Sequence, residues 1–305
     1  MADNSEYAEL QFSPKIPYGF RHPIWPQSDG SVAPDDKFKF DLDTDRVYDK
    51  NYSNHGLLKL LRYTFSSIDD NTHSLAFMFK TQSYGKHDLP AKDKAHGEHS
   101  MLRWCYELIE NEMKNSIPGE IFEFGCFTGI SSAKISIASS FCVKNLYIFD
   151  SFEGLPDPKK YGVGEQKSYY EPGEYSSSFE SVRFNLSTHG LEKGVTLVKG
   201  FFETSIPKFK NYDPDMKISY AFIDVDLSRS IEECLEYVIP RLSPGGMIFM
   251  DELADKDNLS IFEKFGFFDP AKFEIRSICA KTGNIKDGAT RPEDHHNCGI
   301  IKKIS

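Results

Sequence analysis

The sequence predicts an α/β fold, namely a Rossmann-like, doubly wound, seven-stranded sheet that is mostly parallel with an antiparallel C-terminal strand. Three observations lead to this prediction. Short apolar runs alternate with segments of helical or mixed pattern between residues 120 and 250, which is typical of parallel βαβ units. Acidic residues lie at the ends of four of these runs. Two further apolar runs, joined by a polar stretch without helical pattern, close the chain.

The composition fits one large domain or two small ones. The chain has 305 residues, of which 39% are hydrophobic, enough to bury a full core. No run of eighteen apolar residues predicts a membrane span, and no signal peptide is indicated, so we expect a cytoplasmic protein without a membrane partner. The net charge of −10 argues against a nucleic-acid partner. The six cysteines form no CxxC pair and are expected to be reduced, mostly core residues.

Residues 1–95 are predicted to form an N-terminal extension, and residues 96–305 the main domain. The first 55 residues are polar, but they carry aromatic side chains such as Phe12, Tyr18 and Trp25, which disordered tails seldom do. We therefore expect the extension to pack on the body as a lid, or on a second copy as an oligomerisation arm; a flexible leader is the alternative. Short helices are expected at 56–67 and 73–83.

The main domain is predicted to begin with a helix over residues 97–114, where apolar residues recur at helical spacing. Strands are expected at 120–124, 145–150, 195–199, 219–224 and 245–250, with helical segments at 129–141, 177–190 and 228–240. Strands at 272–279 and 298–304 are expected to form an antiparallel pair at the sheet edge. The stretch Ser243 to Gly246 is expected to be a turn that leads into the fifth strand.

The turn after the first strand, FEFGCFTGISS, predicts a small-molecule site. Gly125 and Gly129 let the backbone pass close to a ligand, and the following helix offers free N–H groups; Thr128 and Ser131 are candidate helix caps. The spacing differs from the Gly-x-Gly-x-x-Gly of dinucleotide sites, so the turn suits a nucleoside without a pyrophosphate. An ordinary tight turn is the alternative.

Acidic residues at the other strand ends extend this candidate site. Asp150 ends the second strand, where a carboxylate can accept both hydroxyls of a ribose, although a turn cap is the alternative. Asp224 ends the fourth strand, and Asp251 and Glu252 follow the fifth. Carboxylates that converge in this way repel one another unless a cation or protons compensate, and Mg²⁺ or Ca²⁺ suits such ligands. Solvated acids on loops are the alternative.

Five segments together resemble a class I S-adenosylmethionine-dependent methyltransferase: EFGCFTG, IFDSFEGLP, VKGFFETSIP, FIDVDLSRS and RLSPGGMIFMDE. More narrowly, they are similar to the macrocin O-methyltransferase family, whose members methylate sugar hydroxyls of natural products with a divalent metal. The resemblance covers about residues 97–304. It implies methyl transfer from S-adenosylmethionine to a hydroxyl of a small metabolite, a sugar or natural product, with Mg²⁺.

The resemblance also implies roles for matching residues. The methionine part of the cofactor would contact the first turn, the ribose would contact Asp150 with Ser151 and Phe152 beside it, and the adenine would lie near Gly200 and Phe201. The residues implied for the first turn are Glu123, Gly125, Phe127, Thr128, Gly129 and Ser131. Asp224, Asp251 and Glu252 would bind the metal, with Asp224 as general base.

Two departures from the family pattern concern the metal and the acceptor. Ser228 stands where the family usually has a tyrosine after the Asp-x-Asp-Leu element, and Glu252 stands where Asp is common. A metal-independent N- or C-methyltransferase therefore stays an alternative, as does a partner subunit that binds cofactor without turnover. A nicotinamide-dependent oxidoreductase is disfavoured because the Gly-x-Gly element is missing.

Two loops could complete the site. His295, or its neighbour His296, is an alternative base in the polar link between the last two strands. Residues 155–177 are predicted to be a long loop without regular structure, and such loops are often functional lids. Its tyrosines Tyr161, Tyr169, Tyr170 and Tyr175 could stack on a sugar or another ring; a plain surface loop is the alternative.

Overall fold

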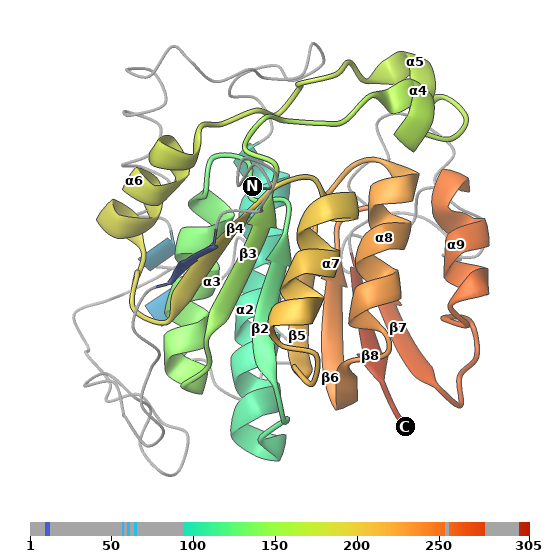
Figure 1. Cartoon of the computed structure of the whole chain (residues 1–305). Coiled ribbons are helices and arrows are strands. Elements are labelled where there is room, and N and C mark those ends of the chain that lie inside the picture. The colour runs from blue at the N-terminus through green and yellow to red at the C-terminus, as the bar shows by residue number, and fades with distance from the viewer. Residues whose placement is uncertain are drawn as a thin grey trace.

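The computed structural model describes residues 10–12, 57, 60–61, 64–65, 94–253, 256–277 and 299–305. An eight-stranded sheet with the order β1-β4-β3-β2-β5-β6-β8-β7 lies at its centre (Figure 1). The strands are β1 Leu10–Phe12, β2 Glu120–Phe124, β3 Leu146–Asp150, β4 Val195–Lys199, β5 Ile218–Ile223, β6 Leu242–Met250, β7 Phe273–Ser277 and β8 Gly299–Lys303.

The seven predicted strands are all present. Strands β4, β3, β2, β5 and β6 run parallel to one another, and β8 lies antiparallel between β6 and β7. The eighth strand, β1, was not predicted: it comes from the N-terminal extension and pairs antiparallel with β4. Its three residues are too few to show the alternation by which a strand is detected in a sequence.

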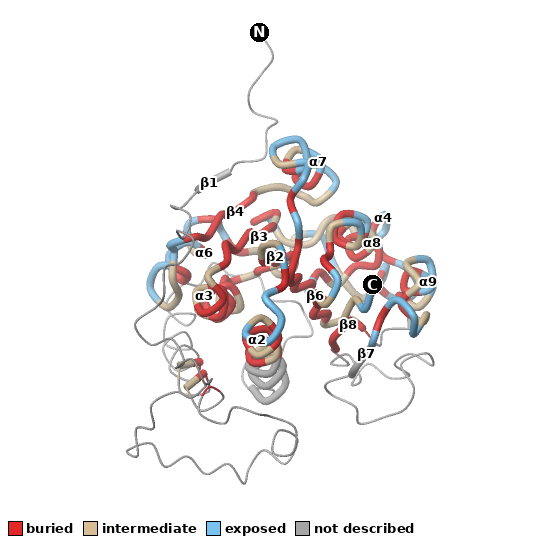
Figure 2. Tube along the Cα trace, turned by 90° about the horizontal axis from the view of Figure 1, so that it is seen from below, coloured by how far each residue is buried: buried red, intermediate tan, exposed pale blue. Residues whose placement is uncertain are grey.

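Helices cover both faces of the sheet (Figure 2). Helices α2 (Lys94–Asn115), α3 (Ile130–Cys142) and α6 (Phe179–His189) contribute to one apolar cluster. Helices α7 (Phe202–Tyr212), α8 (Ser228–Val238) and α9 (Leu259–Lys264) contribute to the other. The sequence analysis missed α7, which holds Pro207 in its interior, and α9, which has only six residues.

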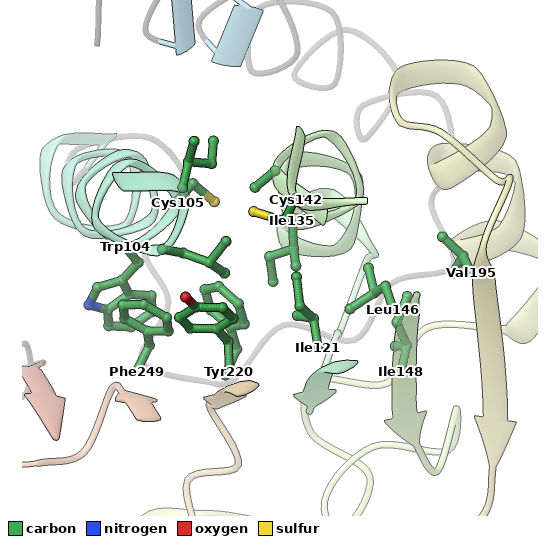
Figure 3. Packing of buried hydrophobic residues seen from close by; sticks show 14 of the residues in the cluster. Trp104, Cys105, Ile121, Ile135, Cys142, Leu146, Ile148, Val195, Tyr220 and Phe249 are labelled. Carbon is green, nitrogen blue, oxygen red and sulfur yellow. The ribbon is translucent and has the colours of Figure 1, made fainter. Parts of the chain in front are cut away.

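Aromatic side chains fill the core beneath α2 and α3. Trp104 lies against Phe249 and Phe222, with ring centroids 5.9 and 6.2 Å away, and the sulfurs of Cys105 and Cys142 point toward each other (Figure 3). The described cysteines are Cys105, Cys126, Cys142 and Cys234, all buried free thiols, which confirms the prediction for these four.

Part of the N-terminal extension packs on this core. Leu57, Leu61 and Phe65 are buried and belong to the cluster beneath α2 and α3, within the helix predicted at 56–67. Together with β1, they show that the extension contacts the body at two places. The helix predicted at 73–83 lies outside the described residues, and the division at residue 95 stays a prediction.

The stretch Ser243 to Gly246 is a bulge inside β6 rather than a turn before it. Ile218 pairs with Leu242 and Tyr220 already pairs with Met247, so the residues between loop out of register. The Ser243 hydroxyl donates to the carbonyl of Pro118 at 2.7 Å, which ties the bulge to the loop before β2. No helix in the described part of the chain combines the length and apolar character of a membrane span.

Candidate active site

The two glycines in the turn between β2 and α3 lie in close contact with other parts of the protein. A Cβ on Gly125, whose φ is +79°, would lie 1.9 Å from the backbone oxygen of Asp224. A Cβ on Gly129 would lie 2.8 Å from the side chain of Val182 in α6. The sequence analysis assigned these glycines to close approach of a ligand, whereas the space that they leave is occupied by β5 and α6.

The N-terminus of α3 has no side-chain cap. Gly129 occupies the N-cap position, so the prediction that Thr128 or Ser131 caps this helix is wrong. The Ser131 hydroxyl instead donates to Oε1 of Glu123 at 2.6 Å, and Ser132 donates to Oε2 at 2.6 Å. The first N–H groups of α3 therefore have no side-chain cap, an arrangement in which a helix N-terminus can bind an anion.

Glu123 is enclosed beneath this turn, with only 2% of its surface exposed. Burial raises the pKa of Glu123 to about 8, although the two serine hydroxyls oppose the shift. Both carboxylate oxygens are occupied by Ser131 and Ser132. The side chain therefore supports the turn from below, and Ser132, which the sequence analysis did not single out, is half of that support.

Asp150 joins the turn after β2 to the turn after β3. Its Oδ2 accepts from the N–H groups of Cys126 at 2.8 Å and Phe127 at 3.3 Å. Its Oδ1 accepts from the N–H of Phe152 at 2.7 Å. Burial raises the pKa of Asp150, and the three N–H donors oppose this. Asp150 thus has the capping role that was the alternative, while Oδ1 retains a lone pair for a further donor.

The other residues assigned to the nucleoside lie at the same strand ends. The N–H of Gly200, just after β4, donates to the carbonyl of Asp150 at 2.9 Å, and Phe201 is the N-cap of α7. The Ser151 hydroxyl donates to the carbonyl of Gly154 at 2.8 Å. Phe152 is buried edge-on against Phe179 of α6, at 5.0 Å. These residues lie at the neighbouring ends of β3 and β4, and Phe152 has a packing partner within the protein.

The ends of β5 and β6 form an acidic cluster. Ile223 pairs with Met250, so the residues that follow lie side by side. Asp224, Asp251 and Glu252 each present a carboxylate oxygen, and these oxygens lie within 4.8 Å of one another. The predicted convergence of these three acids is confirmed. Sequence reasoning found them because two adjacent parallel strands end in the same residue type.

The carboxylates of the cluster repel one another, and one of their oxygens has no hydrogen-bond partner in the described structure. Oε1 of Glu252 accepts from the N–H groups of Asp226 at 2.7 Å and Val225 at 3.1 Å, whereas its buried Oε2 has no hydrogen-bond partner in the described structure. Burial, and then the charges of Asp224 and Asp251, raise the pKa of Glu252 well above its ordinary value. Asp224 as a whole is exposed to solvent, but burial around its carboxyl group still raises the pKa of Asp224 to about 6.

The three acids therefore fit a divalent cation. Carboxylate oxygens are the ligands that Mg²⁺ uses, and an oxygen without a partner in a buried position is costly unless something binds it. A cation at this cluster would supply that partner for Oε2 of Glu252 and reduce the mutual repulsion of the carboxylates.

Residues 155–177 are more ordered than predicted. They contain two short helices, α4 (Pro158–Tyr161) and α5 (Gln166–Tyr169), which Figure 1 shows above α8. The ring of Tyr161 is buried beneath the guanidinium of Arg229, so it is not available to a ligand. Tyr170 donates to Oδ1 of Asp226 at 3.1 Å. His295 and His296 lie outside the described residues, so their proposed role is not placed.

The strand order and the acids at the ends of β2, β3, β5 and β6 define the class as a Rossmann-like methyltransferase fold. Two solved structures share it: the O-methyltransferase NovP, with a TM-score of 0.53, 20% identity and coverage of 69% of this chain and 83% of that one, and the calicheamicin methyltransferase CalS11, with a TM-score of 0.53, 18% identity and coverage of 81% and 91%. The model of the macrocin O-methyltransferase (TylF) family matches residues 46–267. The chain belongs to this family, which confirms the resemblance.

The family match starts at residue 46, so it reaches into the extension, where the sequence analysis saw no resemblance. Among curated relatives, a 4'-O-methyltransferase of a rhamnosyl-tetracenomycin from Streptomyces olivaceus is 29% identical over 50% of this chain and 59% of its own length. The mycinamicin III 3''-O-methyltransferase of Micromonospora griseorubida is 25% identical over 64% of this chain and 82% of its own length.

Proposed function

We propose that this protein transfers a methyl group from S-adenosylmethionine to a hydroxyl of a small metabolite, a sugar or sugar-bearing natural product, and that Mg²⁺ takes part. Family membership supports the class of reaction. The two relatives named above carry names for O-methylation of a rhamnosyl-tetracenomycin and of mycinamicin III, and we extend this acceptor class to the present chain.

One observation carries the proposal: the turn between β2 and α3, which we call the cofactor turn, contacts the acidic cluster. Strands β2 and β5 are neighbours, and the N–H of Asp224 donates to the carbonyl of Phe124 at 3.1 Å. Only a glycine fits at position 125 beside the carbonyl of Asp224. A methyl donor at the turn and a hydroxyl at the cluster would therefore be adjacent, which is what a direct displacement requires.

On the cofactor side, we assign the methionine part to the uncapped N-terminus of α3 and the turn before it. Oδ1 of Asp150 would accept from a ribose hydroxyl with its remaining lone pair. Gly200 and Phe201, at the end of β4, would face the adenine. Glu123 would act by holding this turn in shape, because its own oxygens are bound to serines.

On the acceptor side, a divalent cation held by Asp224, Asp251 and Glu252 would polarise an acceptor hydroxyl and lower its pKa. The acceptor oxygen would then bond to the methyl carbon as the bond between carbon and sulfur breaks. Asp224 would take the proton, because it is the exposed member of the three and adjoins the turn that would hold the methyl donor.

Calorimetric titration of S-adenosylhomocysteine into the purified protein, first with Mg²⁺ and then with EDTA, tests the cofactor assignment. We expect binding in both conditions, because S-adenosylhomocysteine would bind at the turn whereas Mg²⁺ would bind at the acidic cluster. Methyl transfer to a panel of rhamnosylated compounds, assayed by mass spectrometry, should then depend on Mg²⁺. Turnover that persists in EDTA would favour the metal-independent alternative. Binding without turnover on the panel would favour a partner subunit, and no binding would reject the proposal.

A further inference from the structure

The segment 155–175 is fixed at its ends and at its middle. Its ends pair with each other: the N–H of Leu155 donates to the carbonyl of Glu174 at 2.8 Å, and the N–H of Gly173 donates to the carbonyl of Leu155 at 2.9 Å. In its middle, Oε1 of the buried Gln166 accepts from the N–H and the hydroxyl of Ser228, at 3.1 and 2.9 Å. The segment is thus docked on the start of α8, just beyond the acidic cluster.

Ser228 anchors this docking. The serine is completely buried, and its hydroxyl also lies 2.6 Å from Oδ1 of Asn258. The small side chain of Ser228 lets Oε1 of Gln166 approach to 2.9 Å from its hydroxyl. The docked segment also carries Tyr170, whose hydroxyl donates to Asp226.

Tyr170 reaches the acidic cluster through one residue. Its hydroxyl donates to Oδ1 of Asp226 at 3.1 Å, while the N–H of Asp226 donates to Oε1 of Glu252 at 2.7 Å. Asp226 has a φ of +60°, a left-handed conformation that costs a non-glycine residue free energy and persists where its surroundings fix it. A hydrogen bond to a carboxylate is strong enough to act as such a constraint.

We propose that Tyr170 is a positioning residue of the acidic cluster: by fixing Asp226, it holds Glu252 with its second oxygen turned toward the cation. This inference rests on the proposed cation site. Without the Tyr170 hydroxyl, Asp226 is freer to leave its left-handed conformation, and Oε1 of Glu252 then loses a backbone donor. The affinity for the cation falls, although Tyr170 itself is not a ligand.

The contacts at the far end of the segment predict that loss of the Tyr170 hydroxyl leaves the cofactor side unchanged. The ring of Tyr175 lies edge-on to Phe127 in the cofactor turn at 5.7 Å, and 6.4 Å from the ring of Tyr170. These contacts are between rings and do not involve the Tyr170 hydroxyl. Tyr170→Phe therefore removes the link to Asp226 while the packing toward the cofactor turn stays.

The experiment measures Mn²⁺ binding by electron paramagnetic resonance, with saturating S-adenosylhomocysteine, for the wild type, Tyr170→Phe and Tyr161→Phe. Tyr161→Phe is the matched control, because it removes a hydroxyl from the same segment at a ring that packs on Arg229. We expect Tyr170→Phe to bind Mn²⁺ roughly fivefold to tenfold more weakly, less than a full hydrogen bond to a charged group because Tyr170 acts through Asp226. The affinity for S-adenosylhomocysteine should not change, and Tyr161→Phe should match the wild type.

Equal Mn²⁺ affinities of the wild type and Tyr170→Phe would overturn the inference and leave the proposed function standing. An equal loss in Tyr170→Phe and Tyr161→Phe would also overturn it, because it would show general loosening of the segment. Failure of the wild type to bind Mn²⁺ would reject the cation site, and with it both the metal part of the proposed function and this inference.

Discussion

The two halves of the candidate site differ in how their acids are satisfied. On the cofactor side, both oxygens of Glu123 and both oxygens of Asp150 accept hydrogen bonds from the chain itself. On the acidic side, three carboxylates converge and Oε2 of Glu252 is buried without a partner in the described residues. On the cofactor side the chain itself satisfies the acids, whereas the acidic cluster requires a cation or protons to compensate its charge.

This difference separates two kinds of burial. The carboxyl groups of Glu123 and Asp150 on the cofactor side fix the shapes of turns, so their removal should affect folding and cofactor binding together. The acidic cluster should cost free energy of folding until a cation or protons arrive, so its removal should affect cation binding with little loss of stability. Three substitutions test this contrast, from the largest expected effect to the smallest, and the pH dependence of stability then tests Glu123 by itself.

Gly125→Ala should damage both halves, because position 125 is where they touch. A Cβ there would lie 1.9 Å from the carbonyl oxygen of Asp224, and we expect the free energy of unfolding to fall by about 3 kcal/mol or more. Chemical denaturation measures this. Gly173→Ala is the matched control: its φ is also positive, but the nearest atom to its Cβ is 3.7 Å away, so about 1–2 kcal/mol is expected. Equal losses would contradict the close contact.

Asp251→Asn should separate the halves. The substitution removes one charged ligand from the cluster, and we expect the affinity for Mg²⁺ or Mn²⁺ to fall by about a hundredfold, on the scale of a buried charge interaction. The affinity for S-adenosylhomocysteine should remain, as titration calorimetry can show. Asp215→Asn, at an exposed acid before β5, is the control. A variant at position 251 that binds the cation like the wild type would refute the assignment of the cluster.

Asp150→Ala should have the opposite profile. It removes a proposed acceptor for the ribose and leaves the N–H groups of Cys126, Phe127 and Phe152 without their carboxylate, so binding of S-adenosylhomocysteine should weaken by about 1–3 kcal/mol. Cation binding should persist. Unfolding by denaturant shows how much of the loss comes from destabilised turns. Asp150→Asn keeps an acceptor oxygen, so its affinity for S-adenosylhomocysteine should lie between those of the wild type and Asp150→Ala. Unchanged cofactor affinity in Asp150→Ala would remove Asp150 from the site.

The pH dependence of stability should report on Glu123. The pKa of Glu123 is raised from 4.5 to about 8 in the folded state, so the folded state holds its proton at a pH where the unfolded state has lost it. This contribution to stability is complete below about pH 4.5 and is lost as pH rises toward 8, by at most about 1.4 kcal/mol per pH unit. Thermal melts between pH 5 and pH 8 should decline less steeply for Glu123→Gln. Parallel declines would show that Glu123 is not the titrating group.

Most of the fold and part of the site could be predicted from the sequence. The five parallel strands were found because buried parallel strands are short apolar runs with helices between them. The acids at the ends of β5 and β6 were found because the carboxyl ends of parallel strands meet at one edge. Strand β1 was missed because three residues are too few to show alternation, and helix α7 holds a proline in its interior. The bulge at Ser243 to Gly246 was missed because it depends on the pairing of β6 with β5.

The sequence by itself determined which residues stand at the strand ends, since strand boundaries follow from local hydrophobic pattern. Only the tertiary structure decided what those residues do there. It showed that position 125 has no room for a side chain beside Asp224, that Ser131 supports Glu123 instead of capping α3, and that Tyr170 donates to Asp226. The physical reason is that hydrogen bonds and close contacts join groups far apart in the chain, and neither periodicity nor residue type encodes such pairs.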